Sequence, residues 1–287
     1  PKSILMKLIT ALLLMSIFGI YFSGNKVDKI YINAKIWTGD SSNPLASVMA
    51  IKGDKIIYVG NDASAFEANE VIDLQGKRLL PGFTDNHTHF LSAGYGLASV
   101  QLKDAMTRQE FINRISAFCK AHPDSTWVME GNWDHENWGG ELPSKEWIDS
   151  VSGNHPLFIS RYDGHMAFAN SKAMELAGIS ASTVSPDGGV LVRNAKGEAT
   201  GIFKDAAMGL ISKVIPEPTK AQLDQYFDAA ARHAVERGVT HVNDMNSYGG
   251  WSDLATYRRA AGTDRMILRM YSFVPLATWE KLDSFVQ

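Results

Sequence analysis

The segment at residues 79–90, "LLPGFTDNHTHF", places two histidines one residue apart just after a Pro-Gly break. On a β-strand, residues two positions apart project from the same face, so His87 and His89 point together and Thr88 points away. Two neutral imidazoles on one face can hold a single Zn²⁺ at ~2.0–2.1 Å per bond. Asp85 shares this face and is placed to orient an imidazole N–H. The segment therefore predicts part of a metal site.

A His-x-His pair also occurs as a surface or packing feature, so the rest of the sequence has to support a metal site. The chain has one cysteine, Cys119, which excludes an internal disulfide and a zinc site built from cysteines. A bound metal would therefore be held by His, Asp, Glu or Lys. Cys119 lies in the apolar stripe of a helical pattern and fits a small buried hydrophobic residue.

The residues before the histidine pair, about 25–80, have the pattern of a small all-β layer. Apolar and polar residues alternate over residues 30–36, as expected for a half-buried strand. The stretch "SVMAIKGDKIIYVG" predicts two strands joined by a turn at Gly53 and Asp54. The stretch "EVIDLQGKRLLPGF" predicts another pair of strands around Gln75-Gly76.

After Phe90 the period of the apolar residues becomes helical. Residues 107–122 combine a capping box, formed by Thr107 and Glu110, with one apolar stripe. A second helix is predicted from about Lys220 to Arg237. Its N-cap is Thr219 and its stop signal is Gly238.

A short buried strand, "VTHVND", follows this second helix after a single glycine. A helix, a glycine break and then a strand are typical of an α/β unit. The stretch "RMILRMYSFVPL" predicts the next strand. Residues 127–212 differ, since they contain four tryptophans, several glycines and turn-rich "SPDGGVLVRNAKGEATG". We expect these residues to be an irregular insertion.

The segment around the histidine pair resembles the amidohydrolase superfamily, in which an apolar pair, Pro-Gly-Phe, an acidic residue and His-x-His follow a β layer. The residues that fill this pattern are Leu80, Pro81, Gly82, Phe83, Asp85, His87 and His89. Four further blocks, "GNWDHENWGGELPSKEWID", "RYDGHMAFANSKAMELAGI", "EATGIFKDAAM" and "GVTHVNDMNSYGGW", resemble the branch that includes the N-substituted formamide deformylases. The resemblance runs from about Asp28 to the end of the chain.

The resemblance implies an α/β fold, a metal-dependent hydrolase (β/α)₈ TIM barrel that is incomplete here, with part of a β-sandwich as a composite domain. Residues 25–80 would belong to the sandwich. Residues 81–287 would be the N-terminal part of the barrel, about three of its eight strands, interrupted by the insertion at 127–212. The family's lysine-bearing strand, two later metal histidines and catalytic aspartate are expected beyond Gln287.

The resemblance also assigns roles to other residues. His165, in the Asp-Gly-His motif, would contact the substrate or polarise its carbonyl, unless Asp163 merely holds it in a loop. Trp133 and Asp134 would line the substrate pocket, with packing inside the insertion as the alternative for Trp133. His241 would line the pocket as well.

One interpretation of Lys204 is a carbamylated metal ligand. However, Lys204 precedes the "VTHVND" strand, and Asp205 offers it an ion pair. A direct metal role for Asp244 or His241 is not favoured, because relatives commonly have histidine at the place of Asn243. His87 and His89 are thus the predicted metal ligands.

The predicted activity is hydrolysis of carbon–nitrogen bonds other than peptide bonds, in an amide or formamide substrate, by a metal-activated hydroxide. The predicted cofactor is Zn²⁺, as one or two divalent ions, and the partner is a small amide-type molecule. Two alternatives remain open: hydrolysis of an ester or lactone on the same scaffold, and an inactive truncated chain. The sequence leaves the substrate, the metal number and the oligomeric state open.

Charge and the first residues bear on partners and location. The net charge is −3 and no basic cluster appears, which argues against nucleic-acid binding.

Residues 1–24 carry Lys2 and Lys7 before an uncharged apolar run at residues 8–22. This run is shorter than a comfortable membrane span of ~20 residues and is typical of a secretory signal peptide. We expect export to the periplasm or the exterior; an uncleaved anchor and a buried helix are the alternatives.

Overall fold

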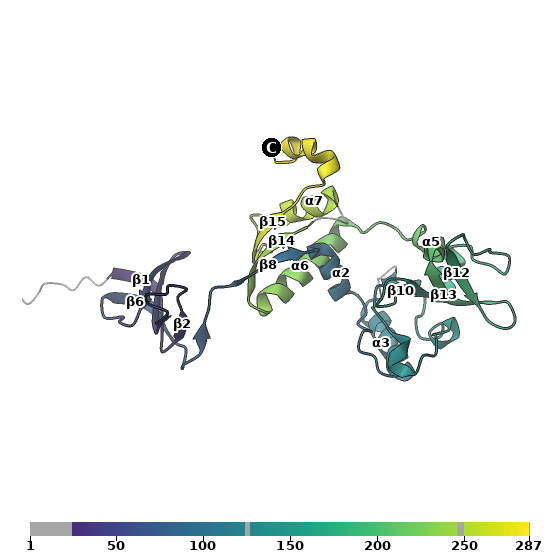
Figure 1. Ribbon diagram of the computed structural model, residues 1–287, viewed down its shortest axis with the longest axis horizontal. Helices are drawn as coiled ribbons and strands as arrows, with labels where there is room; N and C mark the ends of the chain where they lie inside the picture. The colour runs from purple at the N-terminus through teal and green to yellow at the C-terminus, as the bar shows by residue number, and fades with distance from the viewer. Residues whose placement is uncertain (1–24, 124–126, 246–249, 287) are drawn as a thin grey trace, which may run out of the picture. The chain divides into compact units, whose positions relative to one another are not determined.

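The computed structural model describes residues 25–123, 127–245 and 250–286 (Figure 1). The chain divides into two compact units, residues 1–82 and 83–287. The predicted signal peptide at residues 1–24 lies outside the described residues. Within the described ranges, no helix combines the length and hydropathy that crossing a membrane requires.

The first unit consists of strands in two small sheets, which confirms the expected all-β character of its described residues. One sheet has the order β5-β4-β1-β6 and the other the order β3-β2-β7. The strands are β1 (Asn25–Ile32), β2 (Lys35–Trp37), β3 (Leu45–Ala46), β4 (Val48–Lys52), β5 (Lys55–Gly60), β6 (Phe66–Asp73) and β7 (Arg78–Leu79). The first sheet packs on a small apolar core that contains Val27, Ile30, Val48 and Ala50.

The hairpin expected at Gly53 is confirmed. Strands β4 and β5 pair antiparallel, and Lys52 lies opposite Lys55, so Gly53 and Asp54 form the turn. Gly53 has a φ of +59°, a conformation that costs glycine little because it lacks a Cβ.

Two strands flank the turn at Gln75-Gly76, but the prediction that they pair with each other is wrong. Strand β6 runs parallel to β1, and β7 runs parallel to β2. Asn33, between β1 and β2, and both turn residues have positive φ angles, and the Gly76 N–H donates to the Asn33 carbonyl at 2.6 Å. The two segments therefore bend at the same place and run side by side from one sheet to the other, instead of folding back as a hairpin.

The second unit contains a parallel sheet of the order β15-β14-β8. Its strands are β8 (Phe83–Thr88), β14 (Val239–Asp244) and β15 (Arg269–Ser272). The helices α2 (Phe90–Ala98), α6 (Lys220–Glu236) and α7 (Trp251–Ala260) lie beside this sheet (Figure 1). They share one apolar core with β14, formed by Phe90, Leu91, Phe227, Ala231, Val242, Leu254 and Tyr257.

The predicted α6 helix and the strand after it are confirmed. Thr219 and Gln222 form a reciprocal capping box at the start of α6. Gly238, with a φ of +79°, ends the helix, and its carbonyl accepts the Phe83 N–H at 2.8 Å. The end of α6 is thus tied to the beginning of β8, while β14 starts at the next residue.

Residues 127–212 are not irregular, which corrects the sequence interpretation. Five strands form a sheet of the order β12-β13-β11-β10-β9. They are β9 (Val128–Met129), β10 (Leu157–Ser160), β11 (Met166–Ala169), β12 (Gly189–Arg193) and β13 (Ala199–Asp205). The central strands are buried along nearly their whole length, so they lack the alternation that reveals a strand in a sequence.

We call the described part of residues 100–215, which includes this sheet, the sheet lobe. Its helices are α3 (Arg108–Ala121), η1 (His135–Trp138), η2 (Lys145–Trp147), α4 (Ser171–Leu176), η3 (Ala206–Met208) and α5 (Gly209–Ser212). The expected α3 is confirmed, and its buried stripe of Phe111, Ile115 and Cys119 packs in the core of the lobe. The chain continues after β15 into η4 (Leu276–Lys281) and α8 (Leu282–Val286).

Candidate metal site

His87 and His89 lie at the carboxyl end of β8, where the strand passes into α2. Their ring centroids are 5.6 Å apart, and the ring planes meet edge to face at 82°. His87 is exposed and His89 is half-buried. The two imidazoles therefore converge on one side of the chain, as the spacing predicts.

Asp85 contacts the backbone of this segment. Its Oδ1 accepts a hydrogen bond from the His87 N–H at 3.1 Å. The sequence interpretation placed this carboxylate on an imidazole N–H instead. The observed bond fixes the path of the chain between the two residues, so Asp85 helps to shape the strand that carries the histidines.

The junction between β8 and α2 is tied to β14 by several hydrogen bonds. The buried carboxylate of Asp244 accepts from the Phe90 N–H at 2.9 Å and from the Ser272 hydroxyl at 3.0 Å. Thr88 donates its hydroxyl to the Asn243 carbonyl at 3.2 Å, and its carbonyl accepts the Met245 N–H at 2.8 Å. The histidine pair thus stands on a segment that is held from the neighbouring strand.

Tyr257 of α7 lies beneath this junction in the same core. Its burial, with the carboxylates of Asp244 and Asp253 nearby, raises the pKa of Tyr257 far above its ordinary value. The phenol therefore stays neutral at physiological pH.

The donor set of the pair fits a divalent metal that accepts imidazole nitrogen, such as Zn²⁺. Within the described ranges, no group of three or more His, Cys, Asp or Glu side chains is arranged to hold a metal ion. His87 and His89 can therefore supply two ligands of a site, and His165 does not join them as a third.

His165 lies just before β11 and pairs with the end of β13. Its Nδ1 is 3.0 Å from Oδ1 of Asp205, and the Asp205 N–H donates to the His165 carbonyl at 3.0 Å. Asp163 accepts the backbone N–H of His165, also at 3.0 Å. Asp163 therefore holds the backbone of His165 in the loop, as the alternative has it, while the ring contacts Asp205 and the side chain is 77% exposed.

Asp205 has an unusual backbone, with φ at 49° and ψ at −126°. A non-glycine residue in this region is strained by roughly 1–3 kcal/mol and persists only where its neighbours hold it. Here the Asp205 N–H donates to the His165 carbonyl just before β11, and the next N–H, of Ala206, donates to the Gly188 carbonyl beside β12. The sequence interpretation paired Asp205 with Lys204, whereas its carboxylate contacts His165.

Trp133 is a core residue, which corrects its expected place on a pocket wall. Its side chain is fully buried among Phe111 and Phe168, and its Nε1–H donates to the Ile159 carbonyl at 3.0 Å. In this structure the indole has no surface left for a substrate. The packing alternative therefore describes Trp133.

Asp134 makes an ion pair with Arg161, whose Nη2 is 2.9 Å from its Oδ1. Partial burial pushes the pKa of Asp134 upward, but the guanidinium and the Glu136 N–H outweigh it and hold that pKa below its ordinary value. Asp163 contacts the other arm of Arg161. Asp134 is thus ionised and held at the start of η1.

His241 is half-buried in the middle of β14, in register with Thr84 of β8 and Arg269 of β15. The next residue, Val242, enters the core shared with the helices. Since side chains alternate along a strand, His241 projects to the opposite face of the sheet.

Sequence reasoning named Asp205 and Asp244 but missed what their carboxylates contact: the His165 ring and the Phe90 N–H at the start of α2. Both contacts join residues far apart in the chain. Asp205 is 40 positions from His165, and Asp244 is 154 positions from Phe90. One signal was present for Asp244: histidine is a poor helix N-cap, so the helix after His89 needed a cap from elsewhere.

Comparisons with known proteins agree with this architecture. The profile of the amidohydrolase family matches residues 70–286. The chain is 35% identical over 272 residues to Protein LONG AFTER FAR-RED 3 of Arabidopsis thaliana, covering 91% of the chain and 47% of that protein. It is 31% identical over 256 residues to the N-substituted formamide deformylase of Arthrobacter pascens, covering 83% and 46%.

Among solved structures, an uncharacterized metal-dependent hydrolase from Pyrococcus horikoshii is similar, with a TM-score of 0.63 and 26% sequence identity. The match covers 89% of this chain and 50% of that one. The chain thus spans about half the length of the relatives that it matches.

Proposed function

Because the chain belongs to the amidohydrolase family, we propose that it carries part of the active site of a metal-dependent hydrolase that acts on carbon–nitrogen bonds other than peptide bonds. The observation that carries this proposal is the convergence of the His87 and His89 rings at the carboxyl end of β8. Parallel sheets with helices beside them keep their chemistry at the carboxyl ends of the strands.

In this proposal His87 and His89 bind a divalent ion, taken to be Zn²⁺, through neutral imidazole nitrogens. When bound, such an ion acts as a Lewis acid on a carbonyl and lowers the pKa of a coordinated water towards ~7. The remaining ligands would come from the part of the relatives' length that this chain does not span. One ion or two are both compatible with a His-x-His pair.

The fold proposed for the whole protein is a (β/α)₈ barrel, of which β8, β14 and β15 are three strands. Their parallel order and the helices between them support this assignment. The first unit, residues 25–82 as described, would be part of a β-sandwich. The sheet lobe would be an insertion between the first two barrel strands.

His165 is proposed to orient the substrate carbonyl. Its side chain is largely exposed and its Nδ1 contacts Asp205, so the proposal assigns the substrate contact to Nε2. Asp134, fixed by Arg161, and His241, on the sheet face away from the helices, would contact other parts of the substrate.

The proposed substrate is a small amide or N-substituted formamide. The 31% identity to an N-substituted formamide deformylase supports this class. Hydrolysis of esters or lactones is the second candidate, because an activated water attacks either carbonyl. Export through the segment at residues 1–24 is proposed from the sequence alone.

The test measures metal content and hydrolysis together. Zinc and other divalent metals are quantified in the purified unsubstituted protein and in His87→Ala, His89→Ala and His122→Ala. His122 is the matched control, because it is exposed and stacks on Phe118 in the sheet lobe. We expect the first two variants to lose metal and the control to keep it.

A panel of N-substituted formamides, amides and matched esters then separates the two candidate functions. Preferential hydrolysis of the formamides supports the proposal, and preferential hydrolysis of the esters supports the second candidate. Equal metal content in all four proteins would end the proposed metal site. Metal-loaded protein without hydrolysis of any substrate would favour the alternative of an inactive truncated chain.

A further inference from the structure

The helix α2 begins in an unusual way. Its N-cap residue is His89, and the His89 side chain makes no capping hydrogen bond. Helices commonly begin with Ser, Thr, Asp or Asn, whose side chain accepts one of the first N–H groups. The first turn of α2 therefore needs an acceptor from elsewhere in the fold.

Asp244 supplies this acceptor from the end of β14. Its Oδ1 accepts the Phe90 N–H at 2.9 Å, and its Oδ2 accepts the Ser272 hydroxyl of β15 at 3.0 Å. The residue is 1% exposed. A buried carboxylate is costly unless it is hydrogen-bonded, and here both oxygens have partners from neighbouring segments.

These contacts point to a role that local capping residues do not have. We propose that Asp244 is the positioning residue of His89: its carboxylate caps α2 from the adjacent strand and thereby fixes the β8–α2 junction so that the two imidazoles converge. This inference rests on the proposed metal-binding role of His87 and His89. The proposal explains why a histidine can occupy the N-cap position, because the capping hydrogen bond is made by a residue of another strand.

Asp244 acts through His89 and not as a ligand, because both of its oxygens already accept hydrogen bonds. It is also buried, like Val242 two residues earlier on β14.

The first experiment is a Zn²⁺ titration of the full 287-residue chain, followed by the ring signals of its histidines. We expect Asp244→Ala to weaken binding about tenfold or more, the usual cost of losing a residue that orients a ligand. Asp244→Asn keeps an oxygen that accepts the Phe90 N–H, so its affinity should stay within a few-fold of the unsubstituted chain.

Asn170 provides the matched control. It is 1% exposed and caps α4 in the sheet lobe, where its Oδ1 accepts the Ala173 N–H at 3.0 Å. Asn170→Ala should lower the melting temperature as Asp244→Ala does, because both lose a buried cap. It should leave Zn²⁺ affinity unchanged.

A second measurement needs no variant. If capping of α2 and metal binding are coupled, then Zn²⁺ must strengthen the Asp244–Phe90 bond as much as that bond strengthens Zn²⁺ binding. We expect saturating Zn²⁺ to slow hydrogen exchange of the Phe90 amide several-fold more than that of the Ala173 amide. Equal slowing of the two amides would overturn the positioning role.

The outcomes also separate this inference from the proposed function. Zn²⁺ binding that His87→Ala and His89→Ala leave unchanged overturns the metal site, and the positioning role with it. Binding that needs both histidines but tolerates Asp244→Ala overturns the positioning role alone. Equal weakening by Asp244→Asn and Asp244→Ala assigns the effect to charge and overturns positioning by the cap.

Discussion

His165 and Asp205 contact each other twice, through side chains and through backbone. Nδ1 of the imidazole lies 3.0 Å from Oδ1 of the carboxylate, and the Asp205 N–H donates to the His165 carbonyl at the same distance. The backbone hydrogen bond helps to hold Asp205 in its strained conformation. In that conformation the Asp205 carboxylate lies against the His165 ring.

The two variants Asp205→Ala and Asp205→Gly separate these contributions. Both remove the carboxylate, so we expect both to lower kcat/KM about tenfold by freeing the His165 ring. Glycine accepts a positive φ without strain, so Asp205→Gly should be more stable than Asp205→Ala by about 1 kcal/mol. Urea unfolding and steady-state kinetics measure the two effects. A kcat/KM that both variants leave intact would refute the role of Asp205.

Gly94 lies where α2 meets α6 most closely. A Cβ added there would be 1.9 Å from the Tyr226 carbonyl oxygen, a backbone atom that cannot rotate away. We expect Gly94→Ala to destabilise the protein by about 1–3 kcal/mol, because α2 must shift away from α6. Chemical denaturation would measure the change.

The control for Gly94 lies in the same helix. A Cβ at Gly96 would meet nothing within 4 Å. Gly96→Ala should therefore raise stability by up to about 1 kcal/mol, the difference in helix propensity between the two residues. Similar effects of the two substitutions would contradict the close packing of α2 on α6.

Trp133→Phe tests whether Trp133 is a core residue. The substitution removes the Nε1–H that bonds to the Ile159 carbonyl and leaves a buried acceptor without its partner. We expect a loss of about 1–3 kcal/mol in the free energy of unfolding, with an unchanged KM. Trp37→Phe, at a position 53% exposed, should stay within about 0.5 kcal/mol. A raised KM at unchanged stability would restore the pocket-wall interpretation.

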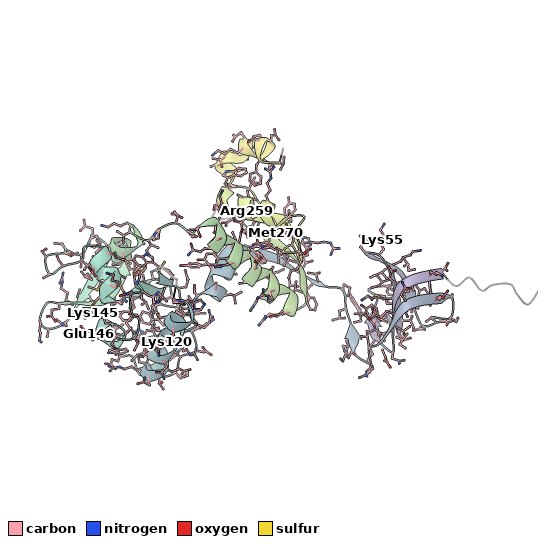
Figure 2. All side chains as sticks on the ribbon, turned by 180° about the vertical axis from the view of Figure 1, so that it is seen from behind. Lys55, Lys120, Lys145, Glu146, Arg259 and Met270 are labelled. Atoms are coloured by element: carbon pink, nitrogen blue, oxygen red, sulfur yellow. The ribbon has the colours of Figure 1, made fainter. Side chains whose placement is uncertain are left out.

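Glu146 makes the stability of the sheet lobe depend on pH. Its Oε1 lies 2.7 Å from the Lys145 ammonium, and both side chains are labelled in Figure 2. Partial burial pushes the pKa of Glu146 upward, but hydrogen bonds from Lys145 and Ser144 outweigh it and lower that pKa from 4.5 to about 2. A depressed pKa stabilises the folded state above the unfolded-state value, and this stabilisation is lost as the pH falls through the folded-state value.

The variant Glu146→Gln should therefore be less stable than the unsubstituted chain above about pH 4.5, and the difference should shrink towards pH 2. Thermal melts of both proteins between pH 7 and pH 2 measure it. In Lys145→Gln the carboxylate loses its cation, so its acid transition should move to higher pH. A difference that stays constant down to pH 2 would rule out this contribution.

Elements with local signals were predictable from the sequence. Thr219, Gln222 and Gly238 delimit α6 through capping bonds that involve near neighbours only. The turn at Gly53 follows from a positive φ that glycine accepts. The proximity of the His87 and His89 rings was predicted from their two-residue spacing, although β8 ends at Thr88 and His89 is already the N-cap of α2.

Features that depend on remote partners were not predictable. The turn at Gln75-Gly76 is real, but nothing local says that β6 pairs with β1 instead of β7. The strand β11 reads "MAFA" and is buried throughout, so its composition does not distinguish strand from helix. Asp244 is recognised as a helix cap only after the fold brings it beside Phe90.

The separation of β8 from β14 along the chain sets an order of assembly. Thr88 and its partner Asn243 are 155 residues apart, whereas the strands of the sheet lobe pair within the intervening chain. Contacts between near neighbours form faster than contacts that close a long loop. During synthesis the sheet lobe can fold before β14 is available to pair with β8. The histidine pair at the end of β8 is therefore among the last features of the second unit to reach its final geometry.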